Sequence, residues 1–165
     1  MKKLILIRHA KSSWEHNVID HERPLNKRGH ADADLVSKYL ARINPQIDYI
    51  LCSDSKRTKQ TAGYFIDNMA LASVKFEQNH DLYDFSGENL IITIKQANSS
   101  INTLMVFGHN HAVTYFVNNY GGMLTDNVPT CGVNIMEFDI EDWTDLQHAV
   151  SIKTIVPKTL KNYKM

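Results

Sequence analysis

Short apolar runs alternate along this chain with longer segments in which apolar residues recur every three or four positions. The first run, Leu4 to Ile7, stops abruptly at a polar pair, which is typical of a buried strand. Later runs have the same character, and the last two flank a charged turn at Glu141 and Asp142. We expect strands at residues 4–7, 48–52, 74–77, 103–107, 133–139 and 149–155.

The segments between these runs have the spacing of amphipathic helices. Asn26 is a suitable N-cap for a first helix, whose apolar stripe ends before Asn44 and Pro45. Further helices are expected around Thr61 to Met69, over residues 88–97 and over residues 112–120. Because strands alternate with helices, we predict an α/β fold, a three-layer α/β/α sandwich with a largely parallel central sheet.

Composition narrows the possible functions and locations. The chain has 165 residues, 43% of them hydrophobic, so we expect one domain over residues 1–165. Lysine plus arginine equals aspartate plus glutamate at 18 each, which argues against nucleic-acid and membrane partners. Cys52 and Cys131 form no CxxC pair, and the first apolar run is too short for a signal peptide. We therefore expect free thiols and a cytoplasmic protein.

Chemically active side chains follow three of the predicted strands. Arg8 and His9 end the first, residues 53–57 follow the second, and Gly108 and His109 follow the run at 103–107. Carboxyl ends of parallel strands meet along one edge of a sheet, so these groups are expected to converge. Arginine donors fit phosphate oxygens, and a neutral imidazole can act as a nucleophile. The pattern favours a local anion site.

The order of these motifs resembles that of the histidine phosphatase superfamily, and within it the small SixA-like phosphohistidine phosphatases. The motifs are residues 7–10 (Ile-Arg-His-Ala), 23–25 (Arg-Pro-Leu) with Gly29 after them, 53–62 (Ser-Asp-Ser-Lys-Arg-Thr-Lys-Gln-Thr-Ala) and 108–110 (Gly-His-Asn). The resemblance extends from Lys2 to about Asp139 and implies a phosphoglycerate mutase-like fold. His111 departs from it, because many members have proline at this position.

The resemblance also implies roles for four residues. His9 would be the nucleophile that forms a phosphohistidine intermediate, while Arg8, Arg57 and His109 would hold the phosphoryl oxygens. Neither a metal nor another cofactor is implied, because these three side chains supply the positive charge. His9 must have one unprotonated ring nitrogen to attack, so its other nitrogen is expected to donate to a backbone carbonyl. His109 would act best in its protonated form, as a donor to phosphate, and a dianionic substrate favours that form.

The general acid is not evident from the motifs. Asp20, Asp84 and Glu88 are the candidates. An alcohol leaves with a pKa of about 15, whereas an imidazole nitrogen has a pKa of about 6.5 and needs less help from an acid. The missing acid motif therefore favours a phosphohistidine protein, or another exposed or small phosphorylated substrate.

Several neighbouring residues have two possible roles. Arg23 could bind substrate at the pocket rim or form a surface ion pair with Asp20 or Glu22. His111 could lie at the pocket edge or at an exposed helix start. Lys11 and Ser12 are expected in a solvated loop, although either could touch phosphate. The lysines at positions 153, 158, 161 and 164 are expected to form a solvated basic tail.

Two other functions are alternatives to catalysis by His9. A zinc hydrolase could use His109 with His111, or His16 with His21, but the chain has no HExxH motif and no second acid at ligand spacing. A non-catalytic module for binding phosphate or phosphoprotein is the main alternative, and it would be expected to lack His9 or one of the arginines, whereas all four pocket residues are present here. The remaining histidines are expected at the surface: His16, His21, His30, His80 and His148.

Overall fold

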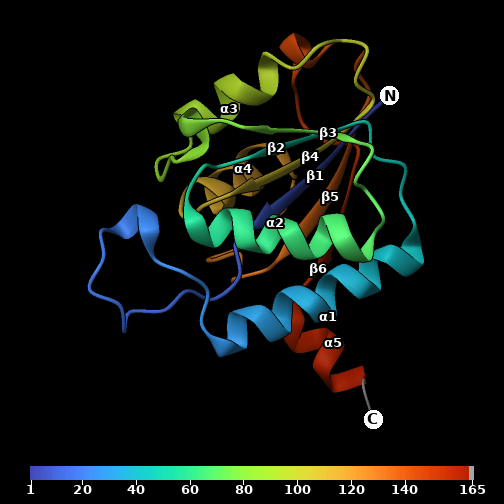
Figure 1. The fold of residues 1–165 in the computed structure, drawn as a ribbon. Helices are drawn as coiled ribbons and strands as arrows, with labels where there is room; N and C mark the ends of the chain where they lie inside the picture. The colour runs from blue at the N-terminus through green and yellow to red at the C-terminus, as the bar shows by residue number, and fades with distance from the viewer. Residues whose placement is uncertain (164–165) are drawn as a thin grey trace.

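The computed structural model describes residues 1–163, which form six strands and five α-helices around one mixed sheet (Figure 1). The strands are β1 (Lys2–Arg8), β2 (Tyr49–Cys52), β3 (Lys75–Gln78), β4 (Thr103–Gly108), β5 (Val133–Phe138) and β6 (Ser151–Ile155). The helices are α1 (Lys27–Ile43), α2 (Lys56–Asn68), α3 (Glu88–Lys95), α4 (Ala112–Tyr120) and α5 (Pro157–Tyr163). Short 3₁₀ turns lie at η1 (Asp20–Glu22), η2 (His80–Leu82) and η3 (Trp143–Asp145).

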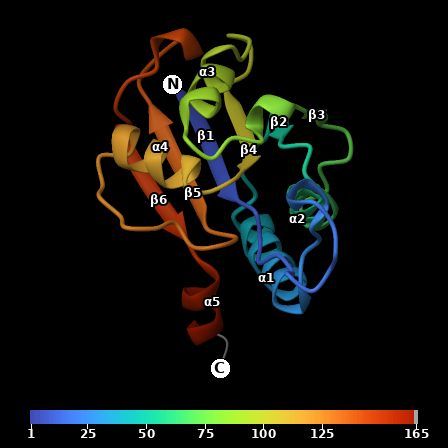
Figure 2. The same cartoon turned by 90° about the vertical axis from the view of Figure 1, so that its left-hand side faces the viewer.

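The sheet has the strand order β3-β2-β4-β1-β5-β6, which can be followed in Figure 2. The pairs β1–β4, β2–β4 and β2–β3 are parallel, whereas β5 is antiparallel to both β1 and β6. The predicted α/β class with a largely parallel sheet is confirmed. Because β2, β4 and β1 are adjacent and parallel, their carboxyl ends lie side by side.

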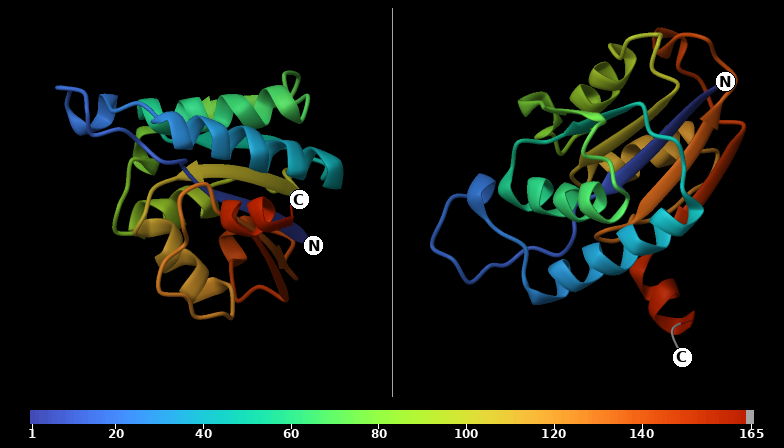
Figure 3. Two further views of the ribbon diagram at one scale, coloured as in Figure 1. Left: turned by 90° about the horizontal axis from the view of Figure 1, so that it is seen from below. Right: turned by 45° about the vertical axis from the view of Figure 1, so that its right-hand side comes forward.

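Helices lie on both faces of the sheet, as the view from below in Figure 3 shows, and an apolar layer fills the space on each face. Leu4 and Leu6 of β1 face the layer under α3 and α4, whereas Ile5 and Ile7 face the layer under α1 and α2. Side chains alternate between the two faces of a strand, so a continuous apolar run fits a strand covered on both sides. The run at the start of the chain is therefore the centre of the core.

The start of α1 holds the long loop after β1 against the body of the protein. Asn26 caps the helix, as predicted, by accepting a hydrogen bond from the Gly29 N–H at 2.8 Å. The Asn26 N–H donates to the Lys11 carbonyl at 3.0 Å. A Cβ atom on Gly29 would lie 2.0 Å from that carbonyl oxygen, so only glycine permits the close approach. Gly29 thus sets the path of the loop.

The carboxyl-terminal segment differs from the expected solvated tail. It forms α5, whose Leu160 packs on the α1 side of the sheet. The Lys161 Nζ lies 2.7 Å from Oδ1 of Asp32, a carboxylate of α1 that is fully buried. Lysines at every third position obscured the helix in the sequence, because few apolar residues separate them. Lys164 lies outside the described residues.

Other sequence-based expectations can be compared with residues 1–163. Both cysteines are free and buried, as expected. No helix in this part of the chain is long and apolar enough to cross a membrane. The histidines expected at the surface are exposed at positions 16, 80 and 148, but His21 and His30 are half-buried. His30 lies 2.9 Å from the Tyr64 hydroxyl, which explains its burial.

Candidate active site

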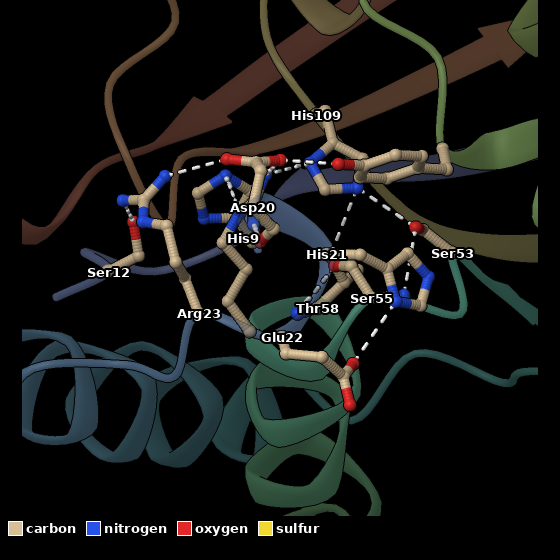
Figure 4. Close-up of polar contacts among 12 residues, drawn as sticks. His9, Ser12, Asp20, His21, Glu22, Arg23, Ser53, Ser55, Thr58 and His109 are labelled. Atoms are coloured by element: carbon tan, nitrogen blue, oxygen red, sulfur yellow. Dashed lines mark hydrogen bonds and ion pairs between the residues drawn. The ribbon is translucent and has the colours of Figure 1, made fainter. Parts of the chain in front are cut away.

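The carboxyl ends of β1, β2 and β4 bring the predicted phosphate-binding residues together. Hydrogen bonds continue beyond the strands: the His9 N–H donates to the Gly108 carbonyl and the Ser53 N–H to the Phe107 carbonyl, both at 3.1 Å. These bonds fix the residues that follow each strand. Figure 4 shows His9, Ser53 and His109 within one polar cluster under the loop that carries Asp20.

His9 is buried with one ring nitrogen committed to the backbone. Its Nδ1 lies 2.7 Å from the carbonyl oxygen of Ala10. A carbonyl only accepts, so Nδ1 carries the proton and Nε2 keeps its lone pair, as the sequence analysis expected. Burial is the main cause that lowers the pKa of His9 to about 3; the Ala10 hydrogen bond acts in the opposite direction, and the charges of the nearby arginines add to the lowering. His9 is therefore a neutral imidazole with an unprotonated Nε2.

Arg57 lies beside that nitrogen. Its Nε donates to His9 Nε2 at 3.3 Å, while its Nη1 donates to the Asp20 carbonyl at 2.6 Å and its Nη2 to Asp20 Oδ2 at 3.0 Å. Arg57 is in the first turn of α2, which Ser55 caps by accepting from the Thr58 N–H. The cap turns the chain directly from β2 into α2 and points the guanidinium toward His9.

Arg8 supplies a second guanidinium, which is partly buried. Its Nη1 donates to the Val128 carbonyl at 2.8 Å, and burial lowers its pKa. Its Nε is a buried donor with no hydrogen-bond partner among the described residues. A buried donor without a partner carries an energetic penalty that a bound ligand could remove. Arg8 is thus a donor suited to an anion.

His109 is buried against His9, with ring centroids 5.2 Å apart. Its Nδ1 faces Arg57 Nη2 at 3.4 Å, and arginine can only donate. The proton of the neutral ring is therefore on Nε2, which lies 2.9 Å from Ser53 Oγ and 3.3 Å from Thr58 Oγ1. Burial, together with His9 and Arg57, lowers the pKa of His109 to about 2. In the free site His109 is neutral and would donate from Nδ1 only after gaining a proton.

Asp20 links the loop after β1 to this cluster, as Figure 4 shows. Its carboxylate accepts from Arg57, from Arg23 Nη1 at 2.9 Å and from the Tyr83 hydroxyl. Partial burial alone would raise the pKa of Asp20, but these hydrogen bonds outweigh it and hold the pKa well below its usual range. Asp20 is therefore a carboxylate at neutral pH and lacks a proton to donate.

Comparison with known proteins places this geometry in a family. Residues 4–90, more than half of the chain, match the family model described as histidine phosphatase superfamily (branch 1). The chain belongs to the histidine phosphatase superfamily. It is 35% identical to an uncharacterized chloroplast protein of Arabidopsis thaliana over 118 residues, which are 66% of this chain and 54% of that protein. The chain thus spans about half the length of that relative.

Solved structures share the fold of this histidine phosphatase superfamily member. The protein histidine phosphatase SixA complexed with tungstate has a TM-score of 0.77 and 20% identity, with 96% of this chain and 99% of that chain covered. A phosphoglycerate mutase from Bacillus anthracis has a TM-score of 0.63 and 14% identity, with 99% and 97% covered. At these identities the likeness concerns the fold, and the predicted phosphoglycerate mutase-like architecture is confirmed.

The structure separates the three acid candidates of this superfamily member. Asp20 lies in the cluster, but Asp84 does not: its carboxylate accepts from the N–H groups of Ser86, Gly87 and Leu90 and holds the start of α3. Glu88 is exposed in the first turn of α3. Asp84 and Glu88 are thus placed for other roles. Asp84 lies three residues before Gly87, the N-cap of α3, so the usual N-cap position does not indicate its contacts.

The residues with two possible roles are also placed. Arg23 is buried: it pairs with Asp20, donates from Nε to the Ser13 carbonyl at 3.0 Å and contacts Ser12 Oγ. The expected ion pair with Asp20 is present; the Arg23 side chain is buried while the Asp20 carboxylate is partly exposed. Ser12 is buried rather than solvated. His111 is exposed at the N-cap of α4, in agreement with the helix-start alternative.

Sequence reasoning missed the residues that support the cluster. Ser53 and Thr58 orient His109, and the Tyr83 ring lies edge-on to His109 with centroids 5.2 Å apart. Ser53 and Thr58 stand inside a motif that was recognised, so their hydroxyls could have been predicted as contacts. Tyr83 is 63 residues from Asp20, and no local pattern indicates that contact.

Potential metal ligands in the described part of the chain gather differently from expectation. His21, Asp54 and His80 form a group whose ligand atoms lie within 4.8 Å of one another. Neither His16 nor His111 belongs to this group. His21 was weighed with the wrong partner, because Asp54 and His80 are distant in sequence and lie on other loops.

Proposed function

We propose that this protein is a metal-independent phosphatase that works through a phosphohistidine intermediate on His9. The observation that carries the proposal is the state of His9: its Nδ1 is bound to the Ala10 carbonyl, so its Nε2 is unprotonated in a site with the buried Arg57 and the partly buried Arg8. A neutral, oriented imidazole is the form that can attack phosphorus. Superfamily membership supports phosphatase chemistry.

The proposed reaction has two steps. His9 Nε2 forms a bond to phosphorus while the bond from phosphorus to the leaving group breaks. Water then attacks the phosphohistidine, which releases inorganic phosphate and returns the electron pair to Nε2. Both transfers spread negative charge over the equatorial phosphoryl oxygens, which fixed donors stabilise.

Arg8, Arg57 and His109 are the proposed donors to those oxygens. Arg8 Nε has no partner among the described residues, and Arg57 Nε points at the reacting nitrogen from 3.3 Å. His109 begins neutral, so a dianionic phosphoryl group would have to raise its pKa before Nδ1 could donate. The charges needed for this step come from protein side chains, without a metal or cofactor.

The ionisation of Asp20 supports a substrate with a good leaving group. Asp20 is the acid candidate that reaches the cluster, and its hydrogen bonds keep it deprotonated. A phosphohistidine side chain leaves as imidazole, with a pKa of about 6.5, and depends less on a general acid than an alkyl monoester. We therefore propose phosphohistidine protein as the substrate class, with other exposed or small phosphorylated compounds as weaker substrates.

The rim of the site fits a protein substrate. Phe85 is exposed and its ring lies 5.1 Å from that of His109, and the exposed Trp14 stacks on Arg23 at 3.3 Å. Aromatic side chains next to the phosphoryl position could pack on the imidazole and flanking residues of a phosphohistidine peptide. We propose no nucleic-acid or membrane partner, and we propose that the protein is cytoplasmic.

The test compares an aryl phosphate and an alkyl phosphate with a phosphohistidine peptide, each with and without EDTA. Wild type, His9→Ala and a matched control, His148→Gln, are assayed, and the phosphoenzyme is trapped by rapid quenching. We expect EDTA-resistant turnover and an acid-labile phosphoenzyme in wild type and control, and neither in His9→Ala. Faster turnover of alkyl monoesters than of the peptide would contradict the proposed substrate class.

The same experiment separates catalysis from simple binding. If no variant turns over any of these substrates while phosphate still raises the melting temperature of wild type, the protein is a binding module on this fold. Turnover that persists in His9→Ala would show that another group is the nucleophile.

A further inference from the structure

A cluster of two histidines and an aspartate lies beside the active site. His21 belongs to η1, Asp54 follows β2, and His80 begins η2, so the cluster joins three loops. His21 Nε2 lies 2.8 Å from Asp54 Oδ1, and His80 Nδ1 lies 2.9 Å from Asp54 Oδ2. None of these side chains belongs to the proposed reaction, and the cluster is therefore a separate feature of the molecule.

The chemistry of the three side chains suits a divalent transition metal. Two imidazole nitrogens and one carboxylate form a known zinc ligand set, which leaves a fourth position for water. Their ligand atoms already lie within 4.8 Å of one another. His80 has 71% of its side chain exposed and can turn to complete the geometry, whereas His21 and Asp54 are at 26% and 28%. Two ligands are thus preplaced and the third is free to adjust.

Glu22 adds the partner that metal-binding histidines usually have. Its Oε2 lies 3.1 Å from His21 Nδ1, the contact drawn in Figure 4. A carboxylate on Nδ1 would keep the proton there when Nε2 gives up its own proton and uses the lone pair to bind a metal. A metal ion would replace the proton that His21 now shares with Asp54.

We propose that His21, Asp54 and His80 form a binding site for Zn²⁺ or a similar divalent transition metal, with Glu22 as the orienting partner. A bound ion ties η1 to the loops after β2 and β3. Because Asp20 precedes His21 in η1, the ion also fixes the turn that holds Arg57 and Arg23. The site is structural, and no step of the proposed reaction passes through the ion.

Direct binding tests this inference without any measurement of turnover, so it stands or fails independently of the proposed function. Tag-free, chelator-treated protein is titrated with Zn²⁺ by calorimetry, and Co²⁺ serves as a spectroscopic probe. We expect one ion per chain in wild type and at least tenfold weaker binding in His80→Gln and Asp54→Asn. The matched control is His148→Gln, which changes another exposed histidine and should bind like wild type.

Thermal unfolding provides a second readout. Zn²⁺ at about 100 times its dissociation constant should raise the melting temperature of wild type and His148→Gln by about 5–10 °C, and that of His80→Gln much less. Because His80 is exposed, His80→Gln should fold normally. Absence of saturable Zn²⁺ binding to wild type, or equal affinity in wild type and His80→Gln, would overturn the proposal.

Discussion

The neutral state of the two active-site histidines predicts a specific loss of stability in mild acid. The pKa values of His9 and His109 are lowered to about 3 and about 2 in the folded protein. In the unfolded chain both return to about 6.5. Below pH 6.5 the unfolded state therefore binds more protons, so the stabilisation is complete above that pH and declines as the pH falls.

The size of the effect follows from these values. Between pH 6.5 and 5.5, protonation of one histidine in the unfolded state alone reduces the free energy of unfolding by about 1 kcal/mol. Both folded-state values lie far below this range, so each histidine contributes the full amount. The pair is expected to account for a loss of about 2 kcal/mol, a large part of a typical stability of about 5–15 kcal/mol.

Urea unfolding at the two pH values measures this loss. The reference is the double variant His9→Asn and His109→Gln, whose amides can replace the hydrogen bonds to Ala10 and Ser53. His21 has a raised pKa, caused mainly by Asp54, and stabilises in the opposite direction, but it is present in both proteins. Wild type should lose about 2 kcal/mol more than the variant. An equal loss in both proteins would refute the neutral assignment and, with it, the state of the nucleophile.

Three substitutions test other parts of the structure. Asp20→Asn should lower the free energy of unfolding by only about 1 kcal/mol, since the carboxylate is partly exposed. This loss should be the same at every pH from 5 to 8, because Asp20 is ionised throughout that range. A loss that changes with pH in urea unfolding would contradict the lowered pKa of Asp20. Gly29→Ala should cost about 1–3 kcal/mol and reduce turnover by displacing the loop, whereas Gly63→Ala, with open space around it, should be neutral or stabilising in the same assays. Lys161→Met should destabilise by about 1–2 kcal/mol in thermal unfolding, since it removes a partner of the buried Asp32; no loss would show that α5 contributes little.

Much of the fold could be predicted because local patterns and tertiary structure agree. The apolar run of β1 is covered on both faces, and the Asn26 cap starts α1 where the sequence indicates. The four motif residues were located because each stands at the end of a strand, just after one or in the first turn of a helix. Local signals identify such positions without knowledge of the packing.

The remainder depends on contacts between distant segments. Tyr83 reaches Asp20 across 63 residues, and the group of His21, Asp54 and His80 combines three loops. Neither can be read from spacing in one sequence. The helix α5 was missed because it is short and has no long apolar stripe, and because the contact of Lys161 with the buried Asp32 joins distant segments.

The position of β1 also determines which part of the site unfolds locally and which part unfolds only with the whole protein. His9 follows a strand that is hydrogen-bonded on both sides, to β4 and β5, whereas Asp20 and Arg23 lie on the loop between β1 and α1. Amide hydrogens of β1 should exchange with solvent only through global unfolding, while those of the loop exchange through smaller local openings. The turn that carries Asp20 can therefore open and close many times between two global unfolding events, while His9 stays in place.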